Sequence, residues 1–384
     1  MRVLLVSPID PKVPSNLKFL MGGESTYTRT LLAHPPPGVE YVHHLDALRE
    51  GEIRYGAFHQ LLRMMVKFRL LPLSAGTFDL KIVGDFDLVH CHGYTLRLSG
   101  DKSRHLPVVL GDSIPNRWSL SAYFEQRSLR IEATYALRRM IHRILGVHDQ
   151  DLTLGDFSTL VVMSEFAKRE HVRLGGDPDR IAVVYPGLPD RAVRQGRRGE
   201  PVRILFVGIW FTRKGGLILW EAYKRLREAF GKKVQLTILG PLPKTLNAQR
   251  STLNALGIVH HDFVSYERMV GEFYPSSDIL VHAPPKAEAY GFVVQEAMSF
   301  GIPVVASRVC ALPEMVVGGR TGILVDPGSV DSLEEALVRL VGDARLRRRM
   351  GRAARKRFLK QFGLPLMHRK LLTIYRLAMR GVRQ

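Results

Sequence analysis

The sequence predicts an α/β protein built from two doubly wound, Rossmann-like domains that face each other across a cleft. Three observations support this prediction. The chain has 384 residues, a length typical of about two domains. Short runs rich in β-branched residues alternate with helix-like stretches, as in parallel sheets that are covered on both faces. A polar, basic segment without periodicity, residues 190–201, interrupts this alternation and is the expected interdomain linker.

Ten apolar runs are the predicted strands, five before the linker and five after it. They are residues 2–7, 87–92, 107–110, 159–163 and 181–185, then 203–207, 235–239, 279–282, 303–307 and 322–325. We therefore expect an N-terminal domain over residues 1–189 and a C-terminal domain over residues 202–360. Residues 361–384 are expected to form a basic helix that packs back on the N-terminal domain.

The cysteine content and the lengths of the apolar runs indicate the cellular compartment of the protein. The two cysteines, Cys91 and Cys310, stand far apart, which argues against a disulfide framework or a thiolate metal site and fits a reducing environment. The first apolar run is too short for a signal peptide. No stretch approaches the roughly 20 apolar residues of a transmembrane helix. We expect a cytoplasmic protein that is soluble or peripherally bound at the inner membrane face.

The net charge of +20 implies an anionic partner such as a phosphate, an anionic lipid or a nucleic acid. Much of the excess lies in residues 344–384, which contain Lys and Arg but no Asp or Glu. Residues 53–71 carry apolar side chains at helical spacing among several basic ones. They are predicted as a basic amphipathic helix, which fits a membrane surface, an ordinary domain helix or a lid over the acceptor site.

The strongest functional signal is the segment from Glu288 to Glu296. Glu288 and Gly291 are expected in a loop after a strand, where ligands bind in open parallel sheets, and an apolar helix follows. The amides of Gly291, Phe292 and Val293 would point from the helix N-terminus toward an anion such as a diphosphate. Glu288 would then meet sugar hydroxyls, and Glu296 the hydroxyls of a ribose.

This segment, EAYGFVVQEAMSFGIPVVAS, resembles the signature of the retaining family 4 glycosyltransferases, in which seven residues separate two glutamates and the fold is the two-Rossmann GT-B fold. Other family-like segments follow the family order: DLVHCHG, VVMSEFAKR, IAVVYPG, FVGIWFTRKG, SSDILVHAPPKAEAYG and LPEMVVGGRTGILVDPG. The resemblance implies transfer of a hexosyl group from a nucleoside diphosphate sugar, with retention of anomeric configuration and without a metal or other cofactor. It places the acceptor, a sugar, a lipid-linked or a small molecule, on the N-terminal domain and the donor on the C-terminal domain.

The resemblance also assigns roles to basic and glycine residues. Arg213 and Lys214 follow the first strand of the second domain, and such a pair suits a diphosphate because charge-assisted bonds to phosphate are strong. Family members use this pair on the donor phosphates. Many of them have a further Arg directly after the glycine that ends the strand, where this chain has Ile209. In the first domain, the loop containing Gly22 and Gly23 would cover the donor phosphates.

His90 and His92 end a predicted strand of the first domain. We expect their side chains on opposite faces, so that only one of them faces the cleft. The resemblance favours His92, which would lie near the donor sugar with a catalytic role beside Glu288. A His-x-His pair can also bind a metal, but side chains on opposite faces do not easily chelate one ion, so no metal site is expected.

Two other functions remain open. The high basic charge is compatible with a non-catalytic nucleic-acid-binding protein, although no interleaved aromatic and basic face is evident and the Glu288–Glu296 segment would be unexplained. No specific nucleic acid is therefore expected as a partner. A sugar-nucleotide epimerase of the same fold is the second alternative. The pairing of Arg213 and Lys214 with two glutamates fits transfer better.

Overall fold

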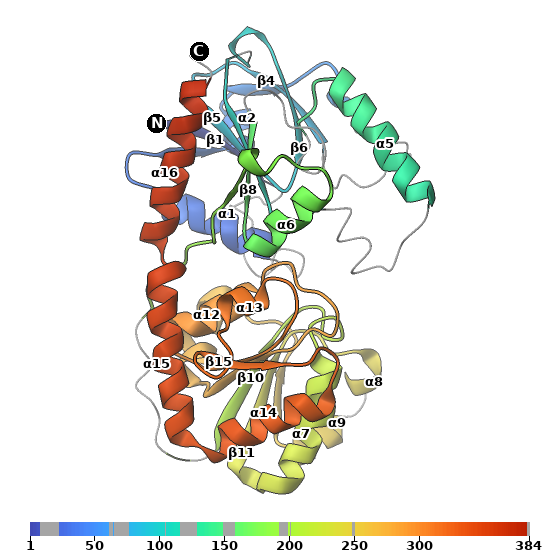
Figure 1. Ribbon diagram of the computed structural model, residues 1–384, viewed down its shortest axis with the longest axis vertical. Helices are drawn as coiled ribbons and strands as arrows, with labels where there is room; N and C mark the ends of the chain where they lie inside the picture. The colour runs from blue at the N-terminus through green and yellow to red at the C-terminus, as the bar shows by residue number, and fades with distance from the viewer. Residues whose placement is uncertain are drawn as a thin grey trace. The chain divides into compact units, whose positions relative to one another are not determined.

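The computed structural model describes residues 1–7, 23–60, 64, 77–103, 105–115, 129–148, 158–191, 199, 201–247 and 250–381. The chain forms two compact units (Figure 1). The first unit contains the N-terminal strand and residues 24–187 and 365–384. The second unit contains residues 188–364. The chain therefore passes from one unit to the other after Gly187 and again after Leu364.

The first unit is built on a parallel six-stranded sheet in the order β2-β1-β5-β7-β8-β9. These strands are β1 (Arg2–Val6), β2 (Glu40–His43), β5 (Leu88–His92), β7 (Val108–Asp112), β8 (Ser158–Val162) and β9 (Ile181–Val183). A smaller sheet contains β3 (Ile53–Tyr55), β4 (Thr77–Ile82) and β6 (Thr95–Ser99). The described helices are α1 (Gly23–Ala33), α2 (His44–Arg49), α5 (Leu129–Ile144) and α6 (Glu165–Arg173). The central strands are buried along their length because helices cover a parallel sheet on both faces.

The second unit repeats this design with the order β12-β11-β10-β13-β14-β15, again all parallel. The strands are β10 (Val202–Val207), β11 (Val234–Leu239), β12 (Ile258–His261), β13 (Ile279–His282), β14 (Val304–Ser307) and β15 (Gly322–Val325). The helices are α7 (Gly216–Phe230), α8 (Lys244–Asn247), α9 (Arg250–Ala255), α10 (Tyr266–Arg268), α11 (Tyr274–Ser276), α12 (Phe292–Ser299), α13 (Leu312–Met315), α14 (Val330–Gly342) and α15 (Ala344–Gln361).

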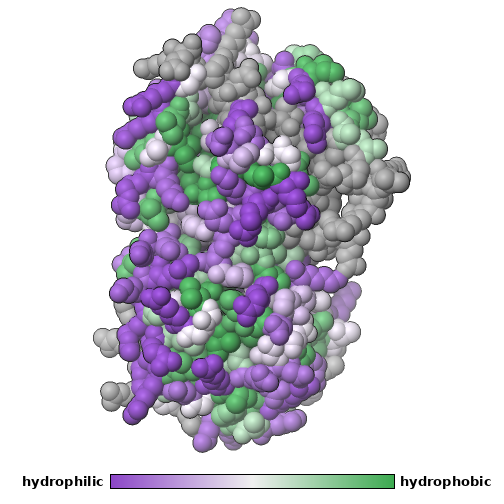
Figure 2. Space-filling view, viewed as in Figure 1, coloured by the Kyte–Doolittle hydropathy of each residue, from purple (hydrophilic) through white to green (hydrophobic). Residues whose placement is uncertain are grey.

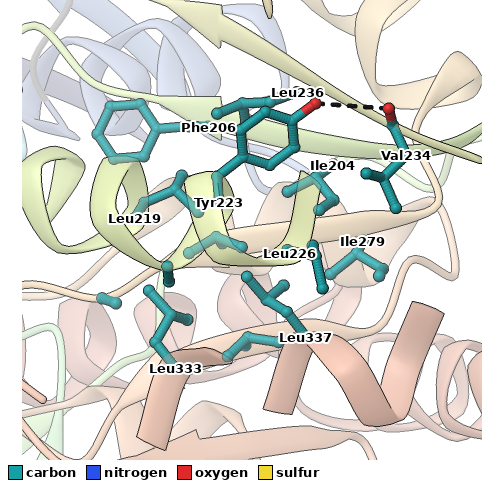
Figure 3. Close-up of a cluster of buried hydrophobic side chains, with 14 of the residues drawn as sticks. Ile204, Phe206, Leu219, Tyr223, Leu226, Val234, Leu236, Ile279, Leu333 and Leu337 are labelled. Atoms are coloured by element: carbon teal, nitrogen blue, oxygen red, sulfur yellow. Dashed lines mark hydrogen bonds between the residues drawn. The ribbon is translucent and has the colours of Figure 1, made fainter. Parts of the chain in front are cut away.

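Helices α7 and α14 close one face of this second sheet (Figure 3). Their apolar side chains, including Leu226 and Leu337, pack on Ile204 and Ile279 of the strands. Tyr223 is fully buried among them, and its hydroxyl donates to the carbonyl of Val234 at 3.4 Å. A buried phenol needs such a partner. The core therefore fixes the strand ends from which the candidate site is built.

The last helix, α16 (Leu364–Gly381), packs in the first unit. Its Tyr375 is fully buried and shares hydrogen bonds with Tyr41 on β2, at 2.8 Å between hydroxyl oxygens, and with Nδ1 of His90 on β5, at 2.6 Å. Lys370 also donates to the carbonyl of Val183 at 3.1 Å. These bonds tie the C-terminal helix to strands that lie far earlier in the chain.

All ten predicted strands are present, with ends within two residues of the predicted ones, and the fold class of two Rossmann-like units is confirmed. The helix predicted over residues 53–71 is wrong at its start, because Ile53–Tyr55 forms β3, antiparallel to β4. Ile53 is buried and pairs with Ile82, and this pairing outweighs the helical spacing. Residues 61–63 and 65–71 lie outside the described part of the chain.

Candidate functional site

The loop between β10 and α7 carries Arg213 and Lys214 to the end of β13. Gly215, the N-cap of α7, has a φ of 88°, and a Cβ there would lie 1.9 Å from the carbonyl oxygen of Ala283. Only glycine permits so close a backbone approach in this conformation. The tight contact therefore holds the basic loop directly against the residues that follow β13.

Lys214, His282 and Glu288 form a buried charged cluster. The ammonium of Lys214 donates to Oε2 of Glu288, and Nε2 of His282 lies 2.9 Å from the same oxygen. An ionised carboxylate only accepts hydrogen bonds, so Nε2 of His282 carries the proton. The three side chains come from the β10–α7 loop, the end of β13 and the following loop. Neighbouring strands β10 and β13 bring them together.

The pKa values of the cluster follow from burial and from the charges it contains. Burial alone would raise the pKa of Glu288, but Lys214 and the hydrogen bond from His282 outweigh it and hold that pKa far below its usual value. Burial lowers the pKa of Lys214, although Glu288 opposes this effect and Arg213 adds to it. Burial likewise lowers the pKa of His282. Glu288 is therefore ionised and His282 neutral, and Arg213 adds positive charge near Lys214.

Helix α12 begins next to this cluster. Gly291 is its N-cap, with a φ of 96°, and Phe292 is its first residue. A Cβ on Gly291 would lie 3.7 Å from Cγ of Glu288 and 2.8 Å from a methyl carbon of Leu312. The first amides of a helix lack carbonyl partners within it and carry partial positive charge. The first turn, which includes Val293, therefore adds its amides to the cations of the basic loop.

Glu296 lies further along α12 and has different partners. The hydroxyl of Tyr274 donates to Oε2 of Glu296 at 2.5 Å. Tyr266 and Arg191 also act on this carboxyl. Burial raises the pKa of Glu296 to about 7, although the hydrogen bond from Tyr274 and the charge of Arg191 both lower it. The pKa of Glu288 is thus lowered, whereas that of Glu296 is raised.

In the first unit, the expectation that His90 and His92 lie on opposite faces is wrong. Residues two apart in a strand share a face. The Tyr27 ring contacts both imidazoles, with centroid distances of 6.3 Å to His90 and 4.7 Å to His92. Both also border the same Gly111.

His92 is almost completely buried at the carboxyl end of β5. Neither of its ring nitrogens has a hydrogen-bond partner among the described residues. Burial, with a smaller contribution from His90, lowers the pKa of His92 to about 3, and burial lowers that of His90 to about 4. Both rings are therefore neutral, and His92 keeps an unused donor and an unused acceptor.

Two further expectations concern glycines and metal. Gly22 lies outside the described residues, and Gly23 is the first residue of α1. Within the described ranges, no group of three or more His, Cys, Asp or Glu side chains is arranged to hold a metal ion. No helix in that same part of the chain is long and apolar enough to cross a membrane.

Sequence reasoning missed His282, Tyr274 and Tyr266. His282 had a usable signal, since it is the polar end of the apolar strand ILVH, where ligands meet a parallel sheet. The two tyrosines had none, because they lie in short helical turns without a motif.

The chain is similar to known proteins both in sequence and in fold. Residues 190–357 match the family model described as glycosyl transferases group 1. The chain is 28% identical over 289 residues to a D-inositol 3-phosphate glycosyltransferase of Arthrobacter sp. (strain FB24), covering 71% of this chain and 66% of that protein. A protein of the same name from Paenarthrobacter aurescens (strain TC1) is 28% identical over 343 residues, covering 84% of this chain and 79% of that protein.

Among solved structures, sucrose-phosphate synthase from Thermosynechococcus elongatus superposes with a TM-score of 0.67 and 17% identity, covering 99% of both chains. At that identity the likeness concerns the fold alone. Residues 190–357 thus match the glycosyl transferases group 1 model, the curated relatives are named glycosyltransferases, and the fold is that of GT-B glycosyltransferases. The family resemblance expected from the motifs is therefore confirmed.

Proposed function

We propose that the chain transfers a hexosyl group from a nucleoside diphosphate sugar to an acceptor, with retention of anomeric configuration and without a metal ion. The observation that carries this proposal is the buried contact of Lys214 with Glu288 beside the start of α12. The contact joins a cation to an ionised carboxylate, and Gly291 at the start of α12 lies next to that carboxylate. The cations and amides suit the diphosphate of a sugar nucleotide, and the carboxylate suits the hydroxyls of its sugar.

The leaving diphosphate needs positive charge that does not have to reorganise during the reaction. Arg213, Lys214 and the amides from Gly291 to Val293 can supply it. Cations and amides already fixed by the fold would take the place that a metal ion holds in other sites. These fixed charges support metal independence, and activity in the presence of a chelator tests it.

The sugar needs groups that orient it and accept its hydroxyl protons while positive charge develops at the anomeric carbon. Glu288 is ionised, so it can only accept, and it is held rigidly by two donors. His92 is neutral, and neither of its ring nitrogens has a partner in the part of the chain that the structure describes. We assign Glu288 and His92 to the sugar, and Glu296 to the ribose hydroxyls, where Tyr274 would be its competing donor.

The test is a transfer assay on the purified chain with UDP-, GDP- and ADP-hexoses, with and without a chelator. The acceptor panel includes D-inositol 3-phosphate, because the relatives carry that name. Released nucleoside diphosphate gives the rate, and proton NMR of the product gives its anomeric configuration. Glu288→Gln should lower turnover by about two orders of magnitude or more, the scale at which one preorganised polar group acts.

Glu221→Gln is the matched control. Glu221 lies in the same unit and also pairs with a lysine, Lys224, at 2.6 Å, but on an exposed face of α7. It should retain full activity. Full activity in Glu288→Gln, inversion of configuration, or loss of activity with a chelator would each contradict the corresponding part of the proposal. Accumulation of an epimeric donor without acceptor would favour an epimerase.

We also propose peripheral association with an anionic membrane. The net charge of +20 supports this partner, because a basic protein is attracted to anionic headgroups.

A further inference from the structure

Helix α5 of the first unit exposes a row of large apolar side chains. Leu137, Met140 and Ile144 are 50%, 55% and 74% exposed. Spacings of three and four residues place them on one face of the helix. Figure 2 shows apolar surface where α5 lies in Figure 1. Single exposed apolar residues are ordinary, but a continuous row marks an interaction site.

Contacts on the other side of α5 and at its C-terminal end hold the apolar face of the helix outward. His142, on the other side of α5, is fully buried. After the helix, Arg97 on β6 donates from Nε to the carbonyl of Leu145 at 2.8 Å. The backbones of His148 and Leu96 exchange two hydrogen bonds, at 2.6 and 2.9 Å. The C-terminal end of α5 is therefore anchored to the small sheet.

The apolar row is flanked by arginines. Arg139 and Arg143 are exposed and make no ion pair with any residue that the structure describes. From Ala133 to Ile144 the helix contains three arginines and no acidic residue. Cations beside an apolar row match a surface with negative headgroups over an apolar interior.

We propose that this face of α5 lies flat on an anionic lipid surface, with Leu137, Met140 and Ile144 among the acyl chains and Arg139 and Arg143 at the headgroups. The proposal gives a location to the peripheral association proposed above and is independent of the transfer chemistry. Pairing with a second copy of α5 would bring the same arginines together, and like charges disfavour this. Nucleic acid would satisfy the arginines but would leave the apolar row in water.

The test is flotation of the full chain with vesicles of phosphatidylcholine alone or of phosphatidylcholine with phosphatidylglycerol. Met140→Ser/Ile144→Ser removes apolar contact, and Arg139→Gln/Arg143→Gln removes charge. Each variant should lower binding to the anionic vesicles about tenfold, since association of such helices depends on buried apolar area and on charge together. Wild-type binding to neutral vesicles should be much weaker.

The control is Leu359→Ser on α15, which is 49% exposed and stands beside Lys360 in a helix that is more basic than α5. It should bind as the wild type does. All variants should keep the wild-type melting temperature, because the replaced side chains are exposed.

Several results would overturn the proposal. They are absent binding to anionic vesicles, equal binding to neutral ones, unchanged binding of both α5 variants, and a dimer in sedimentation that only the α5 variants dissociate. Binding to duplex DNA that the α5 variants abolish, without binding to vesicles, would also overturn it. Transfer to a soluble acceptor, measured without vesicles, should be unchanged in these variants. That assay separates failure of the lipid site from failure of the proposed activity.

Discussion

Lys214 donates a hydrogen bond to Glu288 across two loops that are 74 residues apart in the chain. Both side chains are largely withdrawn from water, at 17% and 6% exposure. Removing one member of such a pair leaves a buried charge with fewer partners, which costs more than the pair itself contributes. The relationship therefore has consequences for stability as well as for the proposed chemistry.

We expect Lys214→Met to destabilise the second unit by about 3 kcal/mol, because His282 would be the one side-chain donor left to Glu288 among the described residues. Lys214→Met/Glu288→Gln should lose clearly less than the sum of the two single variants. Denaturant unfolding of all four proteins in the cycle gives the coupling free energy. Simple additivity would show that the two groups do not act on each other.

Glu296 should make stability depend on pH in a defined window. Its pKa rises from an ordinary 4.5 to about 7 on folding. Below pH 4.5 the carboxyl is protonated in both states. Between pH 4.5 and about 7 the carboxyl is ionised in the unfolded chain and still protonated in the folded one. The free energy of unfolding therefore falls as the pH rises across this window, by up to about 3 kcal/mol.

The measurement is the difference in unfolding free energy between the wild type and Glu296→Gln from pH 4 to pH 8. This difference should change across the window and become constant above it. Tyr274→Phe should shift the window upward, because the lost hydrogen bond favours the ionised form. A difference that does not vary with pH would contradict the raised pKa.

Two effects of replacing Gly215 can be measured separately: the clash of a new Cβ with Ala283 and the strain of the left-handed backbone conformation. Gly215→Ala places a Cβ against the carbonyl of Ala283, whereas a Cβ on Gly319, which has a φ of 76°, would meet no described atom within 4 Å. Gly319→Ala should cost about 1 kcal/mol for the left-handed conformation alone. Gly215→Ala should cost about 3 kcal/mol and also weaken nucleotide binding, since overpacking displaces the basic loop. Equal melting temperatures for the two variants would contradict the contact.

The hydroxyl of Tyr375 should stabilise the first unit. Tyr375→Phe removes a bond to Tyr41 and leaves Nδ1 of His90 buried without that partner. We expect a loss of about 1–3 kcal/mol. Tyr55→Phe is the control, since Tyr55 is half exposed, and it should be close to neutral. Hydrogen exchange in β5 provides a local measurement, and unchanged protection there would count against the role of the hydroxyl.

The sequence was sufficient for the ten apolar strands of the two parallel sheets, including the edge strands β9 and β15, and insufficient for the two more polar edge strands. Buried parallel strands are apolar throughout, so each can be recognised in the sequence as a continuous run of apolar residues. The edge strands β2 and β12, with sequences EYVH and IVHH, mix polar and apolar residues and were missed, as were the strands of the small sheet. The wrong helix start at Ile53 has the same cause, because strand pairing with distant residues leaves no local pattern.

Some contacts of the candidate site could likewise be predicted from the sequence, and others could not. Glu288 and Gly291 belong to one continuous segment, so their proximity could be inferred from spacing. The contact of Lys214 with Glu288, and the part played by His282, depend on β10 and β13 being neighbours in the sheet, which strand order alone determines. The shared face of His90 and His92 was predictable from the two-residue period of a strand, and the expectation misapplied that period.

Because α16 supplies Tyr375 to the first unit, that unit is not a continuous piece of chain. Expression of residues 1–187 alone would yield a protein without one of its own core helices. A deletion of the last twenty residues, although it follows the group 1 domain in sequence, would damage the first unit instead. Dissection of this enzyme therefore requires circular permutation or co-expression of fragments rather than simple truncation.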